Sequence, residues 1–464
     1  LKRWPLRKSK EIGVETMKKL LATILALVMT LGLCTVSWAD GEIEVSDSAT
    51  LEEAIKNASE SVEIKLVGSV EFSGKQLVIP EGKRVRLDLF GNELKITNYV
   101  TEKGQVKVVG ELTVTDSSEA NGGTISSTYT GTGGRVVDVV SGGKLILLNG
   151  TITAVGMNNA GSAVYVGGTG TAEMSGGKII GQGVRTGTAV NVKSGNASFV
   201  MRGGYVGTTG DGTDSSIYAI SGSSNSVIRV EGNSVVSAPT AVTARNSKIE
   251  IMGGDFTGAM TVKAKSISGG TFSNSVDSTY LADGLKYEVC AGGKYSYYSD
   301  FDSAAAAAAA DGHEVIKVGN SGTGDVPFHI DYADGTGVKP ALRMSKDNFE
   351  LPTPTRSGYT FKGWKVLDCD GTRVLFAGPL SSEEVKSKIF AETAAGDEAE
   401  VRADYSDGVT LIAVWSSNSY YYYAPTTTDT KTDSPKTFDA GVGIYAVTAL
   451  LSVTGMAWAG KKRH

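Results

Sequence analysis

The chain has 464 residues, of which 59 are glycine and 10 are proline, and its formal net charge at pH 7 is −5. So much glycine with so little proline excludes collagen-like and proline-rich chains. It indicates many short strands joined by tight turns, because glycine adopts positive φ angles without strain. The three cysteines and three histidines exclude a disulfide-rich scaffold and argue against a histidine-based zinc site.

The N-terminal region predicts a secreted protein. Met17 and two lysines precede a mostly apolar stretch from Leu20 to Leu33, and small residues stand at positions −3 and −1 before a cleavage site between Ala39 and Asp40. These features are typical of a signal peptide over residues 17–39, after which the mature chain would start. An uncleaved anchor is the alternative, although the stretch is short for a hydrocarbon core of ~30 Å. We expect residues 1–16 to be an upstream extension.

An amphipathic helix is expected next. The pattern Thr50-Leu51-Glu52-Glu53 is typical of a capping box at the start of a helix. The apolar residues that would share one face of this helix are Leu51, Ala54, Ile55 and Ala58. We expect this face to cover the open end of a first coil over residues 62–67, because an uncovered strand edge promotes aggregation.

The middle of the chain repeats a short phrase: glycine or asparagine, then glycine, then any residue, then an apolar residue. The second position of the phrase, which we use as a marker, falls with some drift at Gly123, Gly150, Gly177, Gly204, Asn233, Gly254 and Gly270. The first three intervals are each 27 residues. Short strands at a constant period in the twenties indicate a solenoid, whereas a β-sandwich would not explain equal intervals.

Apolar residues keep fixed distances from these markers. Those three residues before a marker are Leu147, Met174, Met201, Val230, Ile251 and Ile267, and those two residues after are Ile152, Ile179, Val206, Val235, Phe256 and Phe272. A second short strand recurs upstream, over residues 163–166, 189–192 and 241–244. We expect these side chains to fill a right-handed parallel β-helix of about nine coils, spaced ~4.8 Å apart.

The helix position and the phrase from Leu51 to Ala58 resemble the N-terminal lid of pectin-lyase-like β-helix proteins. The resemblance covers about residues 45–297 and is one of pattern, without a catalytic motif. We therefore predict a β-helix domain over residues 40–297 with an N-terminal helical cap.

The repeat ends after the solenoid, and different sequence patterns follow. Ser303 and the alanines 304–310 predict a helix, and residues 315–318 a strand, so residues 298–325 form a helix–strand connector. The motif from Gly358 to Trp364, Gly-Tyr-x-Phe-x-Gly-Trp, and the closing Ala-Val-Trp at residues 413–415 resemble the Listeria–Bacteroides repeat, of internalin B type. That resemblance implies a small β-grasp-like module over residues 326–415. Ser381 and Glu384 predict an inserted helix within it.

The C-terminal end predicts an anchor. Residues 416–437 form a polar linker that ends in Ser434-Pro435-Lys436-Thr437-Phe438, and residues 440–460 are uncharged and followed by a basic tail. Twenty-one helical residues span ~31 Å, which is enough to cross a membrane. Motif, span and tail over residues 434–464 resemble the cell-wall sorting signal of Gram-positive surface proteins, which implies that a sortase cleaves after Thr437 and links the chain to peptidoglycan. Phe438 stands where that family has glycine, and a simple transmembrane helix over residues 438–464 is the alternative.

Catalytic residues are not evident on the solenoid. Glycoside cleavage requires two carboxylates that converge on one bond. The acids between Ile125 and Ser275 are Asp138, Glu173, Asp211, Asp214, Glu231, Glu250 and Asp255. Only Glu173 and Glu250 share a position relative to the markers, and three coils separate them. We therefore expect no catalytic residue, no cofactor and no metal, except that Asp211 and Asp214 are a candidate pair for Ca²⁺, with solvated turn acids as the alternative.

Other candidate residues have open interpretations. Arg202, Arg229 and Arg245 line a candidate binding face or are isolated solvated charges. Cys290 and Cys369 are expected to be free thiols, because they belong to different modules. The sequence assigns no binding residue with more precision than this.

The sequence thus predicts a mainly β protein: a right-handed parallel β-helix, a small β-grasp-like module and a C-terminal transmembrane helix, displayed outside a Gram-positive cell and tethered to its wall or membrane. The leading function is a non-catalytic adhesin or glycan-binding protein, with host or environmental glycans or proteins as partners. A polysaccharide lyase or hydrolase and an architectural stalk are the alternatives. Nucleic acid is not expected as a partner, because the chain between the two basic ends is acidic.

Overall fold

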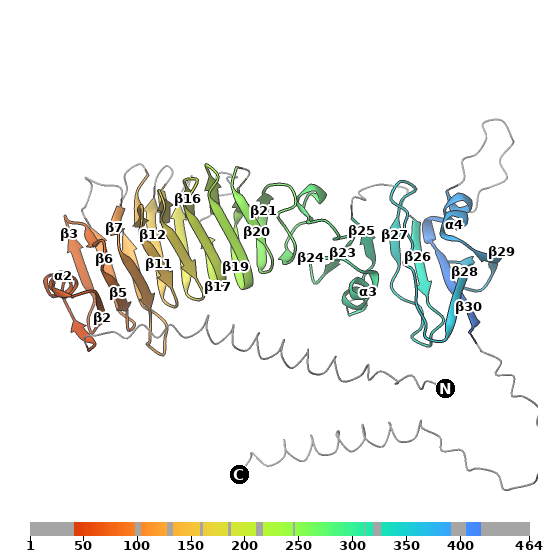
Figure 1. Ribbon diagram of the computed structural model, residues 1–464, viewed down its shortest axis with the longest axis horizontal. Helices are drawn as coiled ribbons and strands as arrows, with labels where there is room; N and C mark the ends of the chain where they lie inside the picture. The colour runs from red at the N-terminus through yellow and green to blue at the C-terminus, as the bar shows by residue number, and fades with distance from the viewer. Residues whose placement is uncertain are drawn as a thin grey trace, which may run out of the picture. The chain divides into compact units, whose positions relative to one another are not determined.

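The computed structural model describes residues 41–418 except 98–103, 128–132, 158–160, 184–186, 210–216, 245, 311, 319–325 and 391–404. These residues form a mainly β protein whose N-terminal part is a parallel β-solenoid of about 9 turns (Figure 1). The predicted signal peptide and membrane span lie outside the described residues. Within the described ranges, no helix is long and apolar enough to cross a membrane.

Each coil contributes strands to three parallel ladders, which we call ladders 1, 2 and 3. Ladder 1 consists of β1 (Ile43–Val45), β2 (Ser61–Leu66), β5 (Arg84–Asp88), β8 (Glu111–Thr115), β11 (Lys144–Leu147), β14 (Thr171–Met174), β17 (Ser198–Thr208), β19 (Val227–Thr243) and β20 (Lys248–Ile251). Ladder 2 consists of β3 (Val70–Ser73), β6 (Glu93–Thr97), β9 (Thr124–Ser127), β12 (Thr151–Met157), β15 (Lys178–Gly183), the later parts of β17 and β19, β21 (Asp255–Thr261) and β22 (Thr271–Phe272).

Ladder 3 completes each coil. It consists of β4 (Leu77–Ile79), β7 (Gly104–Val108), β10 (Arg135–Val139), β13 (Gly161–Gly167), β16 (Gly187–Lys193), β18 (Ile217–Ser223) and the ends of β19 and β21. The three ladders enclose one apolar interior, because every strand points alternate side chains inward.

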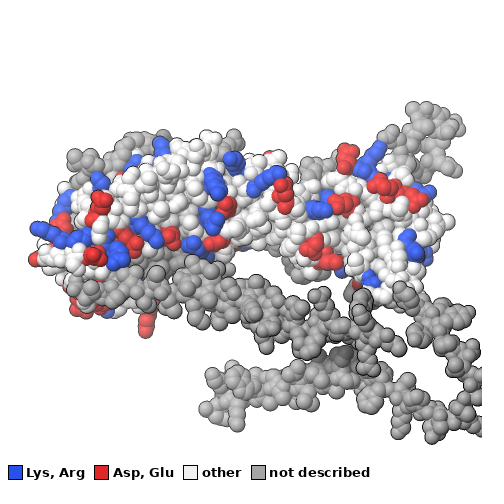
Figure 2. Space-filling model, in the orientation of Figure 1, with Lys and Arg blue, Asp and Glu red and all other residues white. Residues whose placement is uncertain are grey.

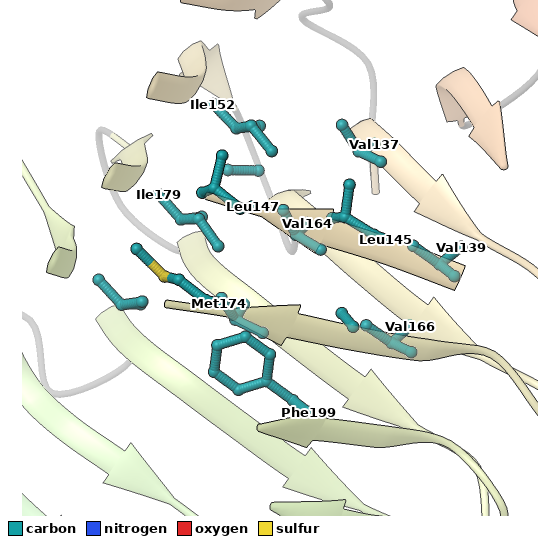
Figure 3. Close-up of a cluster of buried hydrophobic side chains, with 14 of the residues drawn as sticks. Val137, Val139, Leu145, Leu147, Ile152, Val164, Val166, Met174, Ile179 and Phe199 are labelled. Atoms are coloured by element: carbon teal, nitrogen blue, oxygen red, sulfur yellow. The ribbon is translucent and has the colours of Figure 1, made fainter. Parts of the chain in front are cut away.

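The interior columns follow the predicted register. Leu147, Met174 and Met201 pair in sequence along ladder 1, and each is at most 1% exposed. Val164 and Val190 hold the equivalent positions in ladder 3. Figure 3 shows side chains from all three ladders pointing toward one another. Burying each such side chain contributes roughly 1.5–3 kcal/mol, so the columns are the main source of stability.

The repeated glycine is required by backbone geometry. Gly150, Gly177 and Gly204 have φ angles of +84°, +71° and +87°. A Cβ atom on Gly177 would lie 2.5 Å from the carbonyl oxygen of Gly150, in the coil before it. Only glycine combines this φ with so close a backbone approach, which explains why the phrase recurs once per coil.

One predicted marker is wrong by a residue. Ser234, not Asn233, pairs with Gly204 in the preceding coil, and Val236 is buried while Val235 is 37% exposed. The coil contains an extra residue here, and Gly232 takes the positive φ of +64°. The hydroxyl of Ser234 donates to the carbonyl oxygen of Glu231 at 2.6 Å, which fixes the irregular turn.

The helix at the N-terminal end of the solenoid is α2 (Ser48–Asn57), and the predicted capping box at Thr50 is wrong. Asp47 is the N-cap, and its carboxylate accepts from the backbone N–H groups of Ala49 and Thr50 at 2.9 Å each. The hydroxyl of Thr50 instead donates to the Asp47 carbonyl oxygen, because Thr50 already lies inside the first turn. The predicted apolar face is confirmed: Leu51, Ala54, Ile55 and Ala58 are buried in the solenoid core.

The parallel coils end at β22. The short helix η1 (Ser278–Tyr280) precedes the hairpin of β23 (Tyr287–Ala291) and β24 (Lys294–Tyr298), and β24 pairs antiparallel with β22. The rings of Phe256 and Phe272 stack with centroids 5.2 Å apart at the last coil. The predicted helix and strand follow as α3 (Phe301–Ala309) and β25 (Val315–Lys317), and β25 pairs with β23.

The C-terminal sheet has the strand order β27–β26–β30–β28–β29. Its elements are β26 (Val326–Asp331), β27 (Leu342–Met344), β28 (Tyr359–Asp368), β29 (Val374–Leu380), α4 (Ser382–Ile389), η2 (Tyr405–Asp407) and β30 (Val409–Ser417). The predicted inserted helix is confirmed, because Ser381 and Glu384 form a capping box at its start. The motif residues build the core: Trp364 is fully buried, and Phe361 packs edge-on against both Trp364 and Trp415.

Candidate functional site

Several predicted site residues cannot be placed. The sorting motif from Ser434 to Phe438, the cleavage site at Ala39 and Asp40, the candidate Ca²⁺ pair Asp211 and Asp214, and Arg245 lie outside the described residues. Where side chains are described, no group of three or more His, Cys, Asp or Glu is arranged to hold a metal ion. Cys290 and Cys369 are free thiols, as expected.

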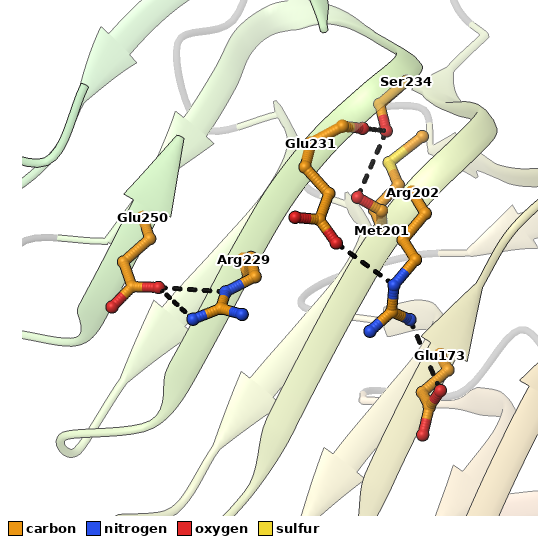
Figure 4. A network of polar contacts seen from close by, with 7 residues as sticks. All are labelled: Glu173, Met201, Arg202, Arg229, Glu231, Ser234 and Glu250. Atoms are coloured by element: carbon orange, nitrogen blue, oxygen red, sulfur yellow. Dashed lines mark hydrogen bonds and ion pairs between the residues drawn. The ribbon is translucent and has the colours of Figure 1, made fainter. Parts of the chain in front are cut away.

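The two described candidate arginines are engaged in ion pairs on the outer face of ladder 1 (Figure 4). Arg202 reaches Glu173 at 3.4 Å in one direction and Glu231 at 3.1 Å in the other. Arg229 donates two hydrogen bonds to Glu250, and these bonds raise the pKa of the Arg229 guanidinium. The interpretation as isolated solvated charges is therefore wrong for these two arginines, whereas their place on a binding face stays a prediction.

The shared position of Glu173 and Glu250 is confirmed by the ladder pairing, in which Glu173 aligns with Val200, then Arg229, then Glu250. Lys144 also pairs with Glu173, at 3.1 Å. Figure 2 shows the result on the surface, where positive and negative side chains interleave over the solenoid strands. Both carboxylates therefore form ion pairs with neighbouring cations, and three coils of the ladder separate them.

Two further carboxylates, those of Asp116 and Asp138, are fixed by hydrogen bonds from neighbouring residues of the solenoid. Asp116 is 3% exposed and accepts from the N–H of Gly123 at 2.6 Å, the N–H of Gly91 at 2.9 Å and the hydroxyl of Ser118 at 2.7 Å. Burial alone would raise its pKa, but these hydrogen bonds outweigh burial and lower it. Asp138 is likewise fixed, because Nη1 of Arg135 donates to both of its carboxylate oxygens, at 2.9 and 3.0 Å. Both are structural groups.

A groove of about 560 Å³ crosses the stacked turns that lead from ladder 3 into ladder 1. Its charged lining residues come from successive coils and are Glu60, Glu81, Lys83, Arg84, Glu111 and Lys144. Glycines and small polar residues of the same turns, including Thr169 and Thr171, complete the lining. This volume lies in the range of pockets that hold small ligands, about 300–1,000 Å³.

Glu111 occupies the centre of this pattern. It opens β8, and its Cα partners in the adjacent coils are Arg84 and Lys144. Those two cations have other contacts, with Glu60 at 3.8 Å and with Glu173 at 3.1 Å. Over the described ranges the Glu111 carboxylate has no hydrogen bond or ion pair. It is an acceptor without a partner among the described residues, placed between two cationic residues.

The repeat did not predict this groove, because its first marker is Gly123. Glu60, Glu81 and Glu111 belong to the first coils, before the regular period begins. A signal was present, since charged residues recur at the first position of ladder 1 strands, as Arg84, Glu111 and Lys144.

Fold and surface together define a parallel β-solenoid protein with a polar groove on its turns. No family model, curated protein or solved structure matches the chain.

Proposed function

We propose that the protein is a non-catalytic glycan-binding protein of the cell surface. The observation that carries the proposal is the groove with the unpartnered carboxylate of Glu111 between Arg84 and Lys144. Sugar hydroxyls both donate and accept hydrogen bonds, so they match a row of alternating acceptors and donors. Because the groove carries both charge signs, it suits a neutral or mixed-charge glycan better than a polyanion.

Display outside the cell is part of the proposal. The signal peptide over residues 17–39 would export the chain, and the sorting motif, span and basic tail over residues 434–464 would tether it. We propose that the solenoid is a right-handed, pectin-lyase-like β-helix and that residues 326–415 are a Listeria–Bacteroides-type, β-grasp-like module. A sortase and peptidoglycan are the implied partners. In this arrangement the linker over residues 416–437 would connect the β-rich part of the chain to its anchor.

One observation favours a second candidate, a polysaccharide lyase or hydrolase. The groove carries three carboxylates, Glu60, Glu81 and Glu111, and glycoside hydrolysis uses two. Binding remains the preferred function, because Glu60 is paired with Arg84 and its side chain is 82% exposed, whereas a general acid works best when it is desolvated.

Glycan binding is tested with the purified full chain on an array of neutral, acidic and amino-sugar glycans. We expect binding to a neutral or amino-sugar glycan, and we expect Glu111→Gln to weaken it about tenfold, which corresponds to ~1.4 kcal/mol. Glu119→Gln is the control, because Glu119 is an exposed acid on a turn between ladders 1 and 2. An array without any bound glycan, or equal losses in both variants, would contradict the proposal.

Wall linkage is tested separately by digesting cells with muramidase and analysing the released protein. Sortase processing predicts a chain that ends at Thr437 and carries peptidoglycan fragments. Full-length chains through His464, recovered only from the membrane fraction, would refute the sortase step and leave a transmembrane tether.

A further inference from the structure

The outer face of ladder 2 holds a tyrosine that rests on a glycine. A Cβ atom built on Gly207 would lie 2.3 Å from the hydroxyl oxygen and 2.5 Å from Cζ of Tyr205. The ring of Tyr205 therefore occupies the space above the bare backbone of Gly207. Tyr205 is half-buried, so part of its ring reaches the solvent.

The neighbours of this ring form a small amphipathic surface, which we call the Tyr205 patch. Along ladder 2, Tyr205 lies between Lys178 and Val235, and Gly207 lies between Ile180 and Ser237. Val235 is 37% exposed and Lys178 is exposed, whereas Ile180 is half-buried. The patch thus offers an aromatic ring and two aliphatic side chains, with an ammonium and a hydroxyl beside them.

A second copy of the same tripeptide shows what is special about the first. Tyr165-Val166-Gly167 in ladder 3 repeats Tyr205-Val206-Gly207, and the ring of Tyr165 likewise covers its glycine, at 2.8 Å from the built Cβ. The guanidinium of Arg135 lies 3.3 Å from the centroid of the Tyr165 ring. Among the described residues, no ring contact, cation–π contact or hydrogen bond involves the side chain of Tyr205. Tyr165 has a stacking partner within the protein, whereas Tyr205 has none among the residues that the structure describes.

We infer that the Tyr205 patch is a stacking site for a pyranose ring, a subsite separate from the groove; this inference rests on the proposed glycan-binding function. A pyranose presents a flat face of C–H groups edged by hydroxyls, which matches an aromatic ring edged by Lys178 and Ser237. A nucleic acid base is the other common stacking ligand, but the acidic chain repels phosphate. A stable protein interface buries roughly 1,000 Å² or more, whereas the patch consists of one ring and four neighbouring side chains.

The test measures the dissociation constants of the full chain for soluble neutral oligosaccharides of glucose, N-acetylglucosamine or xylose. We expect Tyr205→Ala to weaken binding about tenfold and Tyr205→Phe to preserve it, because the ring and not the hydroxyl stacks. Gly207→Ala is the sharper variant. It retains Tyr205 but displaces the ring, and Gly207 is outside the positive-φ region, so alanine fits its backbone. Tyr165→Ala is the control and should bind as the parent does, since Arg135 already occupies that ring.

The outcomes separate this inference from the proposed function. A parent protein that binds none of these sugars would overturn both. Parent binding that Glu111→Gln weakens but that Tyr205→Ala and Gly207→Ala leave unchanged would overturn only the stacking site. Thermal unfolding of each variant identifies a misfolded chain. If Tyr205→Ala or Gly207→Ala misfolds, the binding of Tyr205→Phe is compared with that of the parent. Weaker binding by Tyr205→Phe would mean that the hydroxyl, contrary to the inference, supplies the binding.

Discussion

The outer faces of ladders 1 and 2 differ in how far their side chains find interaction partners within the protein. Along ladder 1, Lys144, Glu173, Arg202 and Glu231 form a continuous chain of ion pairs in which each charge has a neighbour within 3.4 Å. Along ladder 2, the ring of Tyr205 has no partner among the described residues. The charges are the more conspicuous feature of the sequence, but they are satisfied within the protein. The less conspicuous face retains an unpartnered aromatic ring, and on ladder 1 the Glu111 carboxylate in the groove is the exception to the pairing of charges.

The largest expected effect tests what both faces share, their common interior. Met201 is fully buried and stacks between Met174 and Val230 in the neighbouring coils. Met201→Asp would place an unpaired charge there and should destabilise the fold by at least about 3 kcal/mol. Thermal and denaturant unfolding measure the change. A variant that unfolds like the parent would show that the register of ladder 1 is wrong.

A smaller effect is expected at the turn between the two faces. Gly204 has φ +87°, and a Cβ there would lie 2.6 Å from Cε of Met174 and 2.7 Å from the carbonyl oxygen of Gly177. Gly204→Ala should therefore cost about 2 kcal/mol of unfolding free energy. Gly122→Ala is the matched control, since nothing lies within 4 Å of its Cβ position. Equal stability of the two variants would mean that the glycine phrase is not a geometric requirement.

The contribution of the buried carboxylate Asp116 to stability should depend on pH. The pKa of Asp116 is lowered, so its contribution is present at pH values above the ordinary carboxyl pKa of about 4 and is lost as pH falls through the folded value. Asp116→Asn should lower the unfolding free energy by about 1–3 kcal/mol at neutral pH and flatten its pH dependence below pH 4. Unfolding measured between neutral and acidic pH checks this; an unchanged acid limb in the variant would refute it.

The smallest effect is expected on the charged face. The side chains of Arg202 and Glu173 are 49% and 38% exposed, so solvent screens their ion pair. Arg202→Met should change stability by less than about 1 kcal/mol and should leave oligosaccharide binding unchanged. Denaturant unfolding and binding are measured on the same variant. Loss of binding in Arg202→Met would reverse the contrast between the two faces.

The fold was largely predictable because the residues that repeat once per coil are ones whose backbone angles or burial are strongly restricted. Gly150, Gly177 and Gly204 need positive φ, and the apolar residues around them alternate inward, so spacing alone determined the coils. The prediction of the marker failed at Ser234, because an inserted residue shifts the register there. Ser234 takes the position that glycine has in the other coils, and its hydroxyl group fixes the turn by a hydrogen bond. It also failed at Asp47, because two oxygen-bearing residues could each cap the helix and only the backbone decides between them.

The candidate site was much less predictable. The sequence does not show that Arg202 is paired with Glu173 and Glu231, because these residues are far apart along the chain and meet only through the stacking of coils. Nor does it show which of two identical Tyr-Val-Gly tripeptides is covered, since Arg135 precedes Tyr165 by a whole coil. Partners across coils decide what is free to bind.

The most direct test of non-catalytic glycan binding is to incubate the full chain with the glycan that it binds most tightly and to count new chain ends. Reducing ends report hydrolysis, and the ultraviolet absorbance of unsaturated ends reports elimination. We predict saturable binding with no increase in either signal over a protein-free control. Chain ends that accumulate with time and disappear in the Glu111→Gln variant would contradict this and identify the groove as an active site.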